Sequence, residues 1–216
     1  MDAAEMWDVI GGERALTADT LASLGAEQWE TPTLCAGWTV RTLAAHLGFG
    51  PRASAGGVLV EMIRARGSFN RMVDTTARRA ADRPASELVA DLRAAVGSRR
   101  LAPGQSIHNA LLDILVHSQD LAIPLGLDRP MPAAAAKAAA EDVWRHGFPF
   151  HPRRRLRGFQ LTATDVPWTV GDGDRVEGPI WALLLLVTGR RAAVGHLGGP
   201  GAARLSAEPA RVDTAP

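Results

Sequence analysis

The sequence predicts a mainly α-helical protein of the α+β class, in which a helical bundle precedes a small α/β domain. Apolar side chains recur at helical spacing between residues 4 and 146 in segments that are separated by short connections containing Gly or Pro, and five or six helices are expected to form a bundle. After His151 the pattern alternates and carries turn residues, as hairpin strands do. The chain of 216 residues is long enough for a bundle with a hydrophobic core and a smaller second domain.

The helical segments are bounded by capping and breaking residues. Thr39 is a plausible N-cap for the helix that contains Leu43 and Leu47, and Pro132 suits the first turn of a later helix. Gly11 and Gly12 interrupt the first segment. The expected helices cover residues 4–24, 39–48, 53–66, part of 68–82, 86–98, 105–122 and 132–146.

The second part of the chain is expected to form a separate small domain. Its sequence predicts hairpin strands within 158–178, an apolar helix over 178–190 and a short strand near 203–206. We therefore assign residues 1–150 to the helical bundle, 151–206 to the α/β domain and 207–216 to a disordered tail.

Composition and charge exclude several classes of function. The 24 basic and 23 acidic residues nearly cancel, which disfavours nucleic-acid binding, and the arginines at 153–157 are interpreted as a solvated joint between domains. The single Cys35 excludes internal disulfides and multi-cysteine zinc sites. The longest apolar run has eight residues, too few to cross a membrane, and the acidic N-terminus lacks the pattern of a signal peptide. A cytoplasmic protein is expected.

The strongest candidate site lies on the helix over 105–122. Asp113 and His117 are four residues apart, so their side chains leave the same face of a helix whose neighbouring residues are apolar. Such a pair is either a hydrogen-bonded core pair or two ligands of a metal. His46, on the apolar side of its own helix, is the candidate third ligand, and its alternative is a core histidine.

Several other residues have a simple structural interpretation beside a functional one. Cys35 is interpreted as a small buried thiol and not as a nucleophile, because no histidine is near it in the sequence. Trp38 and Trp168 are expected to pack at the edges of turns. Asp120 is placed either to accept the second N–H of an imidazole or to pair with an arginine.

Three segments carry a resemblance to a known family. LCAGWTVRTLAAHL at 34–47 and DILVHSQDLAIPLG at 113–126 resemble the mycothiol-dependent maleylpyruvate isomerase family of the DinB-like metalloprotein superfamily. The segment from Thr162 to Arg190 resembles the small C-terminal domain of that family. The three segments occur in the family's order and span most of the chain.

The resemblance implies a DinB-like four-helix bundle that binds one divalent metal, usually zinc. The family's ligands are a histidine at the end of the first motif and an acidic residue four before a second histidine, which correspond here to His46, Asp113 and His117. The characterised isomerase has glutamate where this chain has Asp113, a carboxylate one methylene shorter. Three protein ligands leave a fourth position open, as in catalytic zinc sites, and the family uses that position for water or the mycothiol thiol.

The resemblance also implies the function. We expect a mycothiol-dependent isomerase or S-transferase acting on a small electrophile such as maleylpyruvate, with Asp120 and Arg190 as further catalytic residues. Arg190 either binds a carboxylate of substrate or cofactor or only complements the C-terminus of its helix. The alternatives are a non-catalytic metal- or ligand-binding protein and a hydrolase that uses zinc-bound water. The expected partners are a small substrate and a low-molecular-weight thiol, without nucleic acid or membrane, in a monomer or homodimer.

Overall fold

The computed structural model describes residues 1–207, which fall into two compact units, 2–129 and 130 onward. The expected tail after residue 207 lies outside the described residues. The expected domain boundary at residue 150 lies one helix beyond the division seen here. The reason is that helix α7 (Ala133–His146) packs against α9 (Ile180–Val187) of the second unit.

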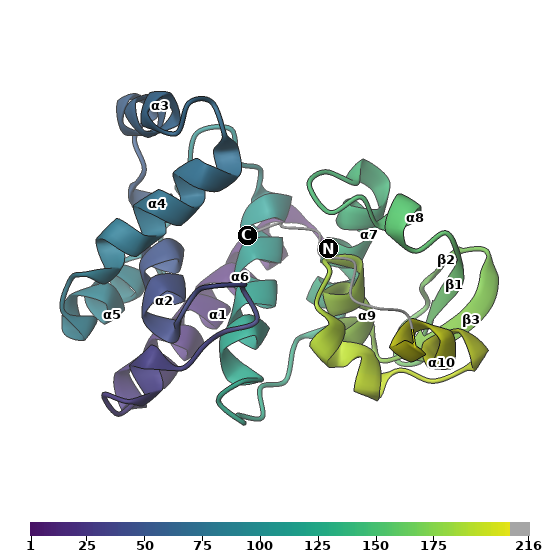
Figure 1. Ribbon diagram of the computed structural model, residues 1–216. Helices are drawn as coiled ribbons and strands as arrows, with labels where there is room; N and C mark the ends of the chain where they lie inside the picture. Colours follow the sequence, from purple (N-terminus) through teal and green to yellow (C-terminus); the bar gives the residue numbers. More distant parts are fainter. Residues whose placement is uncertain (208–216) are drawn as a thin grey trace. The chain divides into compact units, whose positions relative to one another are not determined.

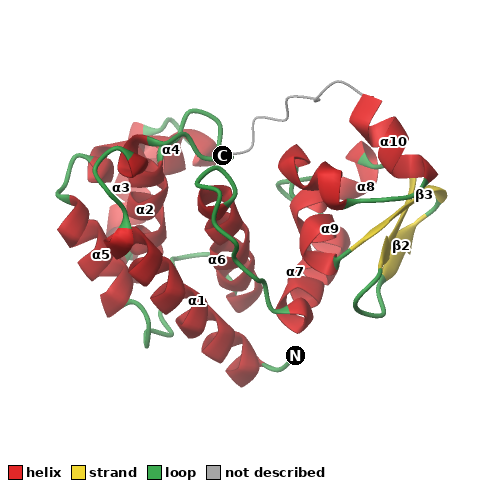
Figure 2. Cartoon of the chain, turned by 90° about the horizontal axis from the view of Figure 1, so that it is seen from below, coloured by secondary structure: helices red, strands yellow, loops and turns green. Residues whose placement is uncertain are grey.

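The N-terminal unit is a four-helix bundle with two additional helices. Helix α1 contacts α5 and α6, and α2 also contacts α5 and α6, so these four helices enclose the core (Figure 2). Helix α4 covers α2, and α3 lies against α4 at the outer end of the unit (Figure 1). The elements are α1 (Ala3–Ser23), η1 (Gln28–Glu30), α2 (Val40–Phe49), η2 (Gly50–Arg52), α3 (Ala55–Arg64), α4 (Phe69–Ala81), α5 (Ala85–Ala94) and α6 (Ile107–Ala122).

Helix α1 runs through the two glycines that were expected to interrupt it. A capping box between Asp2 and Glu5 starts the helix. At Gly11 a Cβ atom would lie 2.9 Å from the carbonyl oxygen of Val96. The glycine therefore lets α1 approach the chain after α5 closely, which compensates for its low helix propensity.

Helix α6 forms the centre of the bundle. Ser106 and Asn109 form a capping box at its start, and all residues from Ala110 to Ala122 except Asp113 are buried. A polar contact joins α6 to α1, in which the hydroxyl of Ser118 lies 3.3 Å from the hydroxyl of Thr17. Arg129, just beyond α6, forms a buried 2.8 Å ion pair with Glu13. This network fixes the face that α6 turns toward α2.

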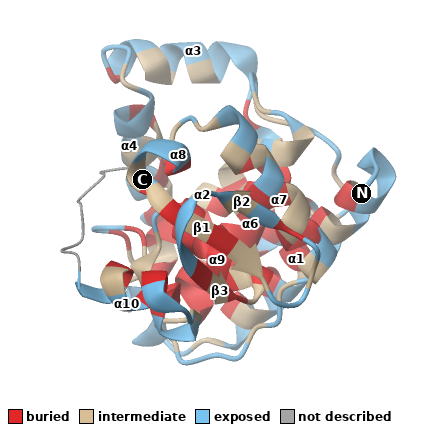
Figure 3. Cartoon of the chain, turned by 90° about the vertical axis from the view of Figure 1, so that its right-hand side faces the viewer, coloured by how far each residue is buried: buried red, intermediate tan, exposed pale blue. Residues whose placement is uncertain are grey.

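The C-terminal unit places helices around a three-stranded sheet. The strand order is β2-β1-β3, with β1 antiparallel to β2 and parallel to β3. Helix α9 packs against α7 and both β1 and β3, and seven of its eight residues are buried (Figure 3). The elements after α7 are α8 (Pro152–Arg155), β1 (Gly158–Ala163), β2 (Thr169–Gly171), β3 (Gly173–Gly178), α9, η3 (Arg191–His196) and α10 (Pro200–Ala207).

These elements confirm the mainly helical α+β class and correct one element. The strand expected near residues 203–206 is wrong, because this segment lies within α10. Pro200 is the first residue of α10, where its fixed φ favours a helix, and the alanines that follow have high helix propensity. Among residues 1–207, no helix combines the length and hydropathy that a membrane span requires.

Candidate metal centre

His46, Asp113 and His117 meet between α2 and α6. The Nε2 atom of His46 lies 3.3 Å from Oδ1 of Asp113, and Nε2 of His117 lies 3.5 Å from the same oxygen. One donor atom from each of the three residues lies within 4.8 Å of the other two. The two imidazole rings meet edge to face with centroids 5.1 Å apart. Asp113 and His117 of α6 thus form a single cluster with His46, which lies 67 positions before Asp113 in the sequence.

Local backbone structure positions these side chains. The side chain of Thr39 caps α2 by accepting a hydrogen bond from the N–H of Thr42, as its sequence context predicts. His46 then lies in the last turn of α2, on the helix side that contacts α6. Asp113 and His117 lie one turn apart on α6, so their donor atoms face the same space.

Two of the donor–donor distances in this cluster suit a divalent metal such as Zn²⁺. In a tetrahedral site with metal–donor distances of about 2.0–2.2 Å, neighbouring donors lie about 3.3–3.6 Å apart. The two distances to the Asp113 oxygen fall in that range. The shorter carboxylate of Asp113 therefore reaches both histidines without a displacement of α6.

The carboxylate of Asp113 supplies negative charge to the cluster. Burial by itself raises the pKa of Asp113, but the imidazoles of His46 and His117, with a smaller contribution from Arg14, lower this pKa to about 2. Asp113 is consequently an anion at neutral pH. Its side chain keeps about a third of its surface exposed, so the cluster opens to solvent on this side.

Asp120 fixes the orientation of His117. Its Oδ2 atom lies 2.8 Å from Nδ1 of His117, and Asp120 is completely buried. An ionised carboxylate accepts hydrogen bonds, so Nδ1 of His117 donates to Asp120, and in the neutral imidazole Nε2 is left with its lone pair toward the cluster. Asp120 was expected to accept either from an imidazole N–H or from an arginine, and its contact with His117 agrees with the first alternative.

Cys35 and Trp38 complete the surroundings, although no sequence pattern predicts that they lie near His117. The thiol of Cys35 donates to Oδ2 of Asp120 at 3.2 Å, and its sulfur lies 3.6 Å from Nδ1 of His117. Trp38 stacks on His117 and packs against His46, with centroid distances of 6.5 and 5.3 Å. Its indole N–H donates to Asp74 at 2.8 Å. Trp38 thus forms an apolar wall beside both imidazoles.

The loop between η1 and α2 brings these two residues to α6. Thr33 donates from its backbone N–H to the carbonyl of Trp38 at 2.8 Å, and Gly37 takes a positive φ of 75° in the turn between them. The N–H of Leu34 donates to the carbonyl of Asp120 at 3.1 Å. Cys35 was correctly expected to be buried. Cys35 and His117 are 82 residues apart, so no local sequence pattern predicts their contact.

Arg190 lies in the C-terminal unit, just after α9. Its Nη1 donates to the carbonyl of Thr188 at 2.8 Å, and its guanidinium lies 5.9 Å from the ring centroid of Phe150. The hydrogen bond to Thr188 satisfies a carbonyl at the C-terminal end of α9. This contact agrees with the expectation that Arg190 complements the C-terminus of its helix. A role in binding a carboxylate stays a prediction.

Comparisons with known proteins identify the family. The family model described as "Mycothiol maleylpyruvate isomerase N-terminal domain" matches residues 11–122, which include His46, Asp113 and His117. Two solved structures, a mycothiol-dependent maleylpyruvate isomerase and its variant with one histidine replaced by alanine, align with TM-scores of 0.64 and 0.63. Each is 12% identical in sequence, and 94% of both chains is covered, so these matches show a common fold. No curated protein sequence matches the chain. With the family model covering more than half of its length, the chain belongs to the mycothiol maleylpyruvate isomerase family.

Proposed function

We propose that this protein is a thiol-dependent isomerase or S-transferase that uses mycothiol and a zinc ion held by His46, Asp113 and His117. The observation that carries the proposal is the convergence of two imidazole nitrogens and one carboxylate oxygen within 4.8 Å. This donor set is typical of catalytic zinc sites, which keep a position for an exogenous ligand. Membership of the isomerase family supports the thiol and the reaction class.

The chemistry divides between the metal and the protein. When bound, the metal supplies positive charge that favours the thiolate form of a coordinated thiol near neutral pH. Asp120 holds the lone pair of His117 toward the cluster, and Cys35 donates a second hydrogen bond to the same carboxylate oxygen. Trp38 excludes water from one side of both imidazoles, which strengthens electrostatic interactions there.

The proposed substrate is a small electrophile such as maleylpyruvate. In an isomerisation, the sulfur adds to one alkene carbon, the former double bond rotates, and elimination of the same thiolate restores the alkene in the trans form. No atom is gained or lost in this sequence. In a transfer reaction, the sulfur instead displaces a leaving group. We propose Arg190 as a residue that binds a carboxylate of the substrate or cofactor.

Metal content is the first test. Elemental analysis of the purified protein should give about one zinc per chain, and His46→Ala and His117→Ala should each lose it. His146→Ala is the matched control, because His146 is exposed and pairs with Asp142 on α7. Circular dichroism should show that all three variants remain folded. Absence of metal after reconstitution with zinc would overturn the proposal.

Thiol dependence separates the proposed function from its alternatives. The zinc-loaded protein should isomerise or conjugate an electrophile only when mycothiol is present, with loss of activity in His117→Ala. Hydrolysis without a thiol would identify a hydrolase that uses zinc-bound water. Stoichiometric metal without turnover of either kind would identify a binding protein that keeps the metal centre.

A further inference from the structure

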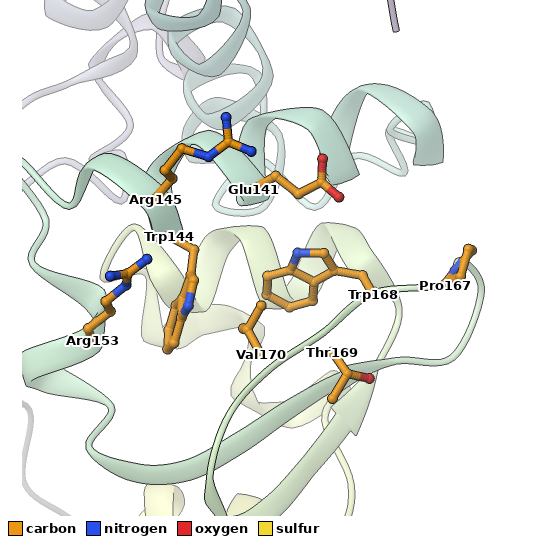
Figure 4. Close-up of a pocket in the computed structure, with 8 residues that line it drawn as sticks. All are labelled: Glu141, Trp144, Arg145, Arg153, Pro167, Trp168, Thr169 and Val170. Atoms are coloured by element: carbon orange, nitrogen blue, oxygen red, sulfur yellow. The ribbon is translucent and has the colours of Figure 1, made fainter.

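The C-terminal unit contains a cavity of 330 Å³ between α7, α8 and β2 (Figure 4). Its volume falls near the lower end of the range for small-molecule sites, so it suits a ligand with one ring. All of its lining residues belong to the C-terminal unit, whereas the metal centre lies entirely in the N-terminal unit. The residues that carry the argument are Glu141, Trp144, Arg145, Arg153, Trp168 and Val170.

Trp168 presents a hydrogen-bond donor that has no acceptor. The residue is 6% exposed, and its Nε1 atom is buried without a hydrogen-bond partner among the described residues. Figure 4 shows this nitrogen on the edge of the indole that faces Glu141 and Arg145 of α7. The hairpin fixes the residue, because the N–H of Ala163 donates to the carbonyl of Trp168 at 2.9 Å. A buried N–H without an acceptor is unfavourable, so a ligand that supplies an acceptor is stabilised here.

Two arginines supply positive charge at the same cavity. Arg145 and Arg153 extend from α7 and α8 on the side of Trp144 (Figure 4). Within residues 1–207, neither guanidinium forms an ion pair or a side-chain hydrogen bond, unlike most arginines of this chain. Glu141, the acidic residue of the lining, forms a 3.7 Å ion pair with Lys137, so the two arginines and this lysine outnumber the one carboxylate. The lining therefore favours an anion.

Two indole rings give the cavity flat apolar faces beside its charged side chains. The rings of Trp144 and Trp168 line it together with Val170. Trp144 rests against β2, since a Cβ atom at Gly171 would lie 3.5 Å from its Cη2 atom. Indole faces bind planar groups by stacking, and guanidinium groups bind carboxylates through paired hydrogen bonds.

We infer that this cavity is a binding site for a small aromatic carboxylate. The ring lies against the indoles of Trp144 and Trp168, and the carboxylate interacts with Arg145 and Arg153 and accepts from Nε1 of Trp168. The inference does not depend on the metal centre or on the proposed thiol chemistry. It concerns a second ligand that the C-terminal unit binds by itself.

Benzoate tests the inference in the full-length protein. The six tryptophans give six indole N–H signals in a nitrogen–proton correlation spectrum, and Trp168→Phe assigns one of them. Benzoate should move the Trp168 signal, because the indole N–H gains an acceptor. Arg145→Ala and Arg153→Ala should each raise the Kd for benzoate by about fivefold or more, as expected for loss of a charge-assisted hydrogen bond. The neutral analogue benzamide should bind more weakly.

Two internal controls make the result decisive. Arg154→Ala removes an exposed arginine of α8 that does not line the cavity, so its Kd should equal that of the wild type. The Trp38 signal reports the metal centre, and benzoate that moves only this signal would overturn the inference. A Trp168 signal that ignores benzoate but moves in Glu141→Gln would show that Glu141 already accepts its proton, which would also overturn it. If benzoate still shifts the Trp168 signal equally in both arginine variants, Arg145 and Arg153 do not bind its carboxylate, and the inference is wrong.

Discussion

Asp120 sets which nitrogen of His117 faces the candidate metal centre, through the 2.8 Å hydrogen bond to Nδ1. Asp120→Asn keeps the size of the side chain and removes its charge. The amide oxygen still accepts from Nδ1, but the bond is no longer charge-assisted. The buried thiol of Cys35 also loses its anionic acceptor. The variant should therefore fold and bind metal more weakly.

The magnitude follows from the difference between the two kinds of hydrogen bond. A bond to a charged group contributes about 1.5–3 kcal/mol, and a neutral one about 0.5–1.5 kcal/mol. The variant should thus lose about 1–1.5 kcal/mol of metal-binding free energy, which corresponds to roughly tenfold in Kd. Removal of a carboxylate that orients a ligating histidine is generally associated with losses of about 10–100-fold.

Competition with a chromophoric chelator measures the zinc affinity of wild type and variant. Urea unfolding of the metal-free proteins measures how much stability the substitution itself removes. Asp74→Asn is the matched control, because Asp74 accepts from the indole N–H of Trp38 at 2.8 Å and no hydrogen bond or ion pair described here joins it to His117. Its zinc affinity should stay within about twofold of the wild type. Equal zinc affinity of Asp120→Asn and wild type would refute the assignment of Asp120 as the residue that orients His117.

Four further outcomes are expected. Asp113→Asn should lower zinc affinity more than His146→Ala in the same chelator competition, because the amide removes the anion that both imidazoles face. Glu13→Ala should cost about 3–5 kcal/mol in urea unfolding, because it leaves the buried guanidinium of Arg129 unpaired; a cost below about 1 kcal/mol would contradict a buried ion pair. Leu115→Ala should cost about 2–5 kcal/mol, because Leu115 is fully buried in α6, and exposed Leu16→Ala is its control. The hydrogen bond from Arg79 lowers the pKa of Glu61, although burial opposes this effect, so Glu61 stabilises the protein at neutral pH and loses that effect as pH falls below the usual value of 4.5. Glu61→Gln should cost under about 1 kcal/mol at neutral pH, because both arginine partners are exposed. In urea unfolding, this difference from wild type should vanish at the lower pH.

Features that depend on local sequence were predictable. The N-cap at Thr39, the i, i+4 spacing of Asp113 and His117 and the alternation after residue 158 each depend on neighbours within one or two turns. Such signals determine which face of an element a side chain occupies. The family resemblance then indicated which two faces meet, a conclusion that periodicity alone does not provide.

Features that depend on tertiary packing were not predictable. The continuity of α1 through Gly11 depends on the approach of Val96, a residue 85 positions later. The sequence predicts a strand near residues 203–206, whereas this segment lies within the helix at 200–207, because its few apolar positions are compatible with both periods. In both places the local pattern was ambiguous, and contacts with distant segments determined the structure.

The surroundings of His117 show why the candidate ligands are easier to predict from sequence than the residues that orient them. A metal ligand needs a donor side chain at a defined helix position, and this requirement leaves a spacing pattern in the sequence. Cys35 is held near Asp120 by a loop, through the backbone bond from Leu34 to the carbonyl of Asp120. A contact of this kind depends on backbone groups that every residue carries, so it leaves no pattern of residue types. The chemistry of the centre is therefore encoded in side chains, whereas its orientation depends in part on a loop whose backbone anchors it to α6.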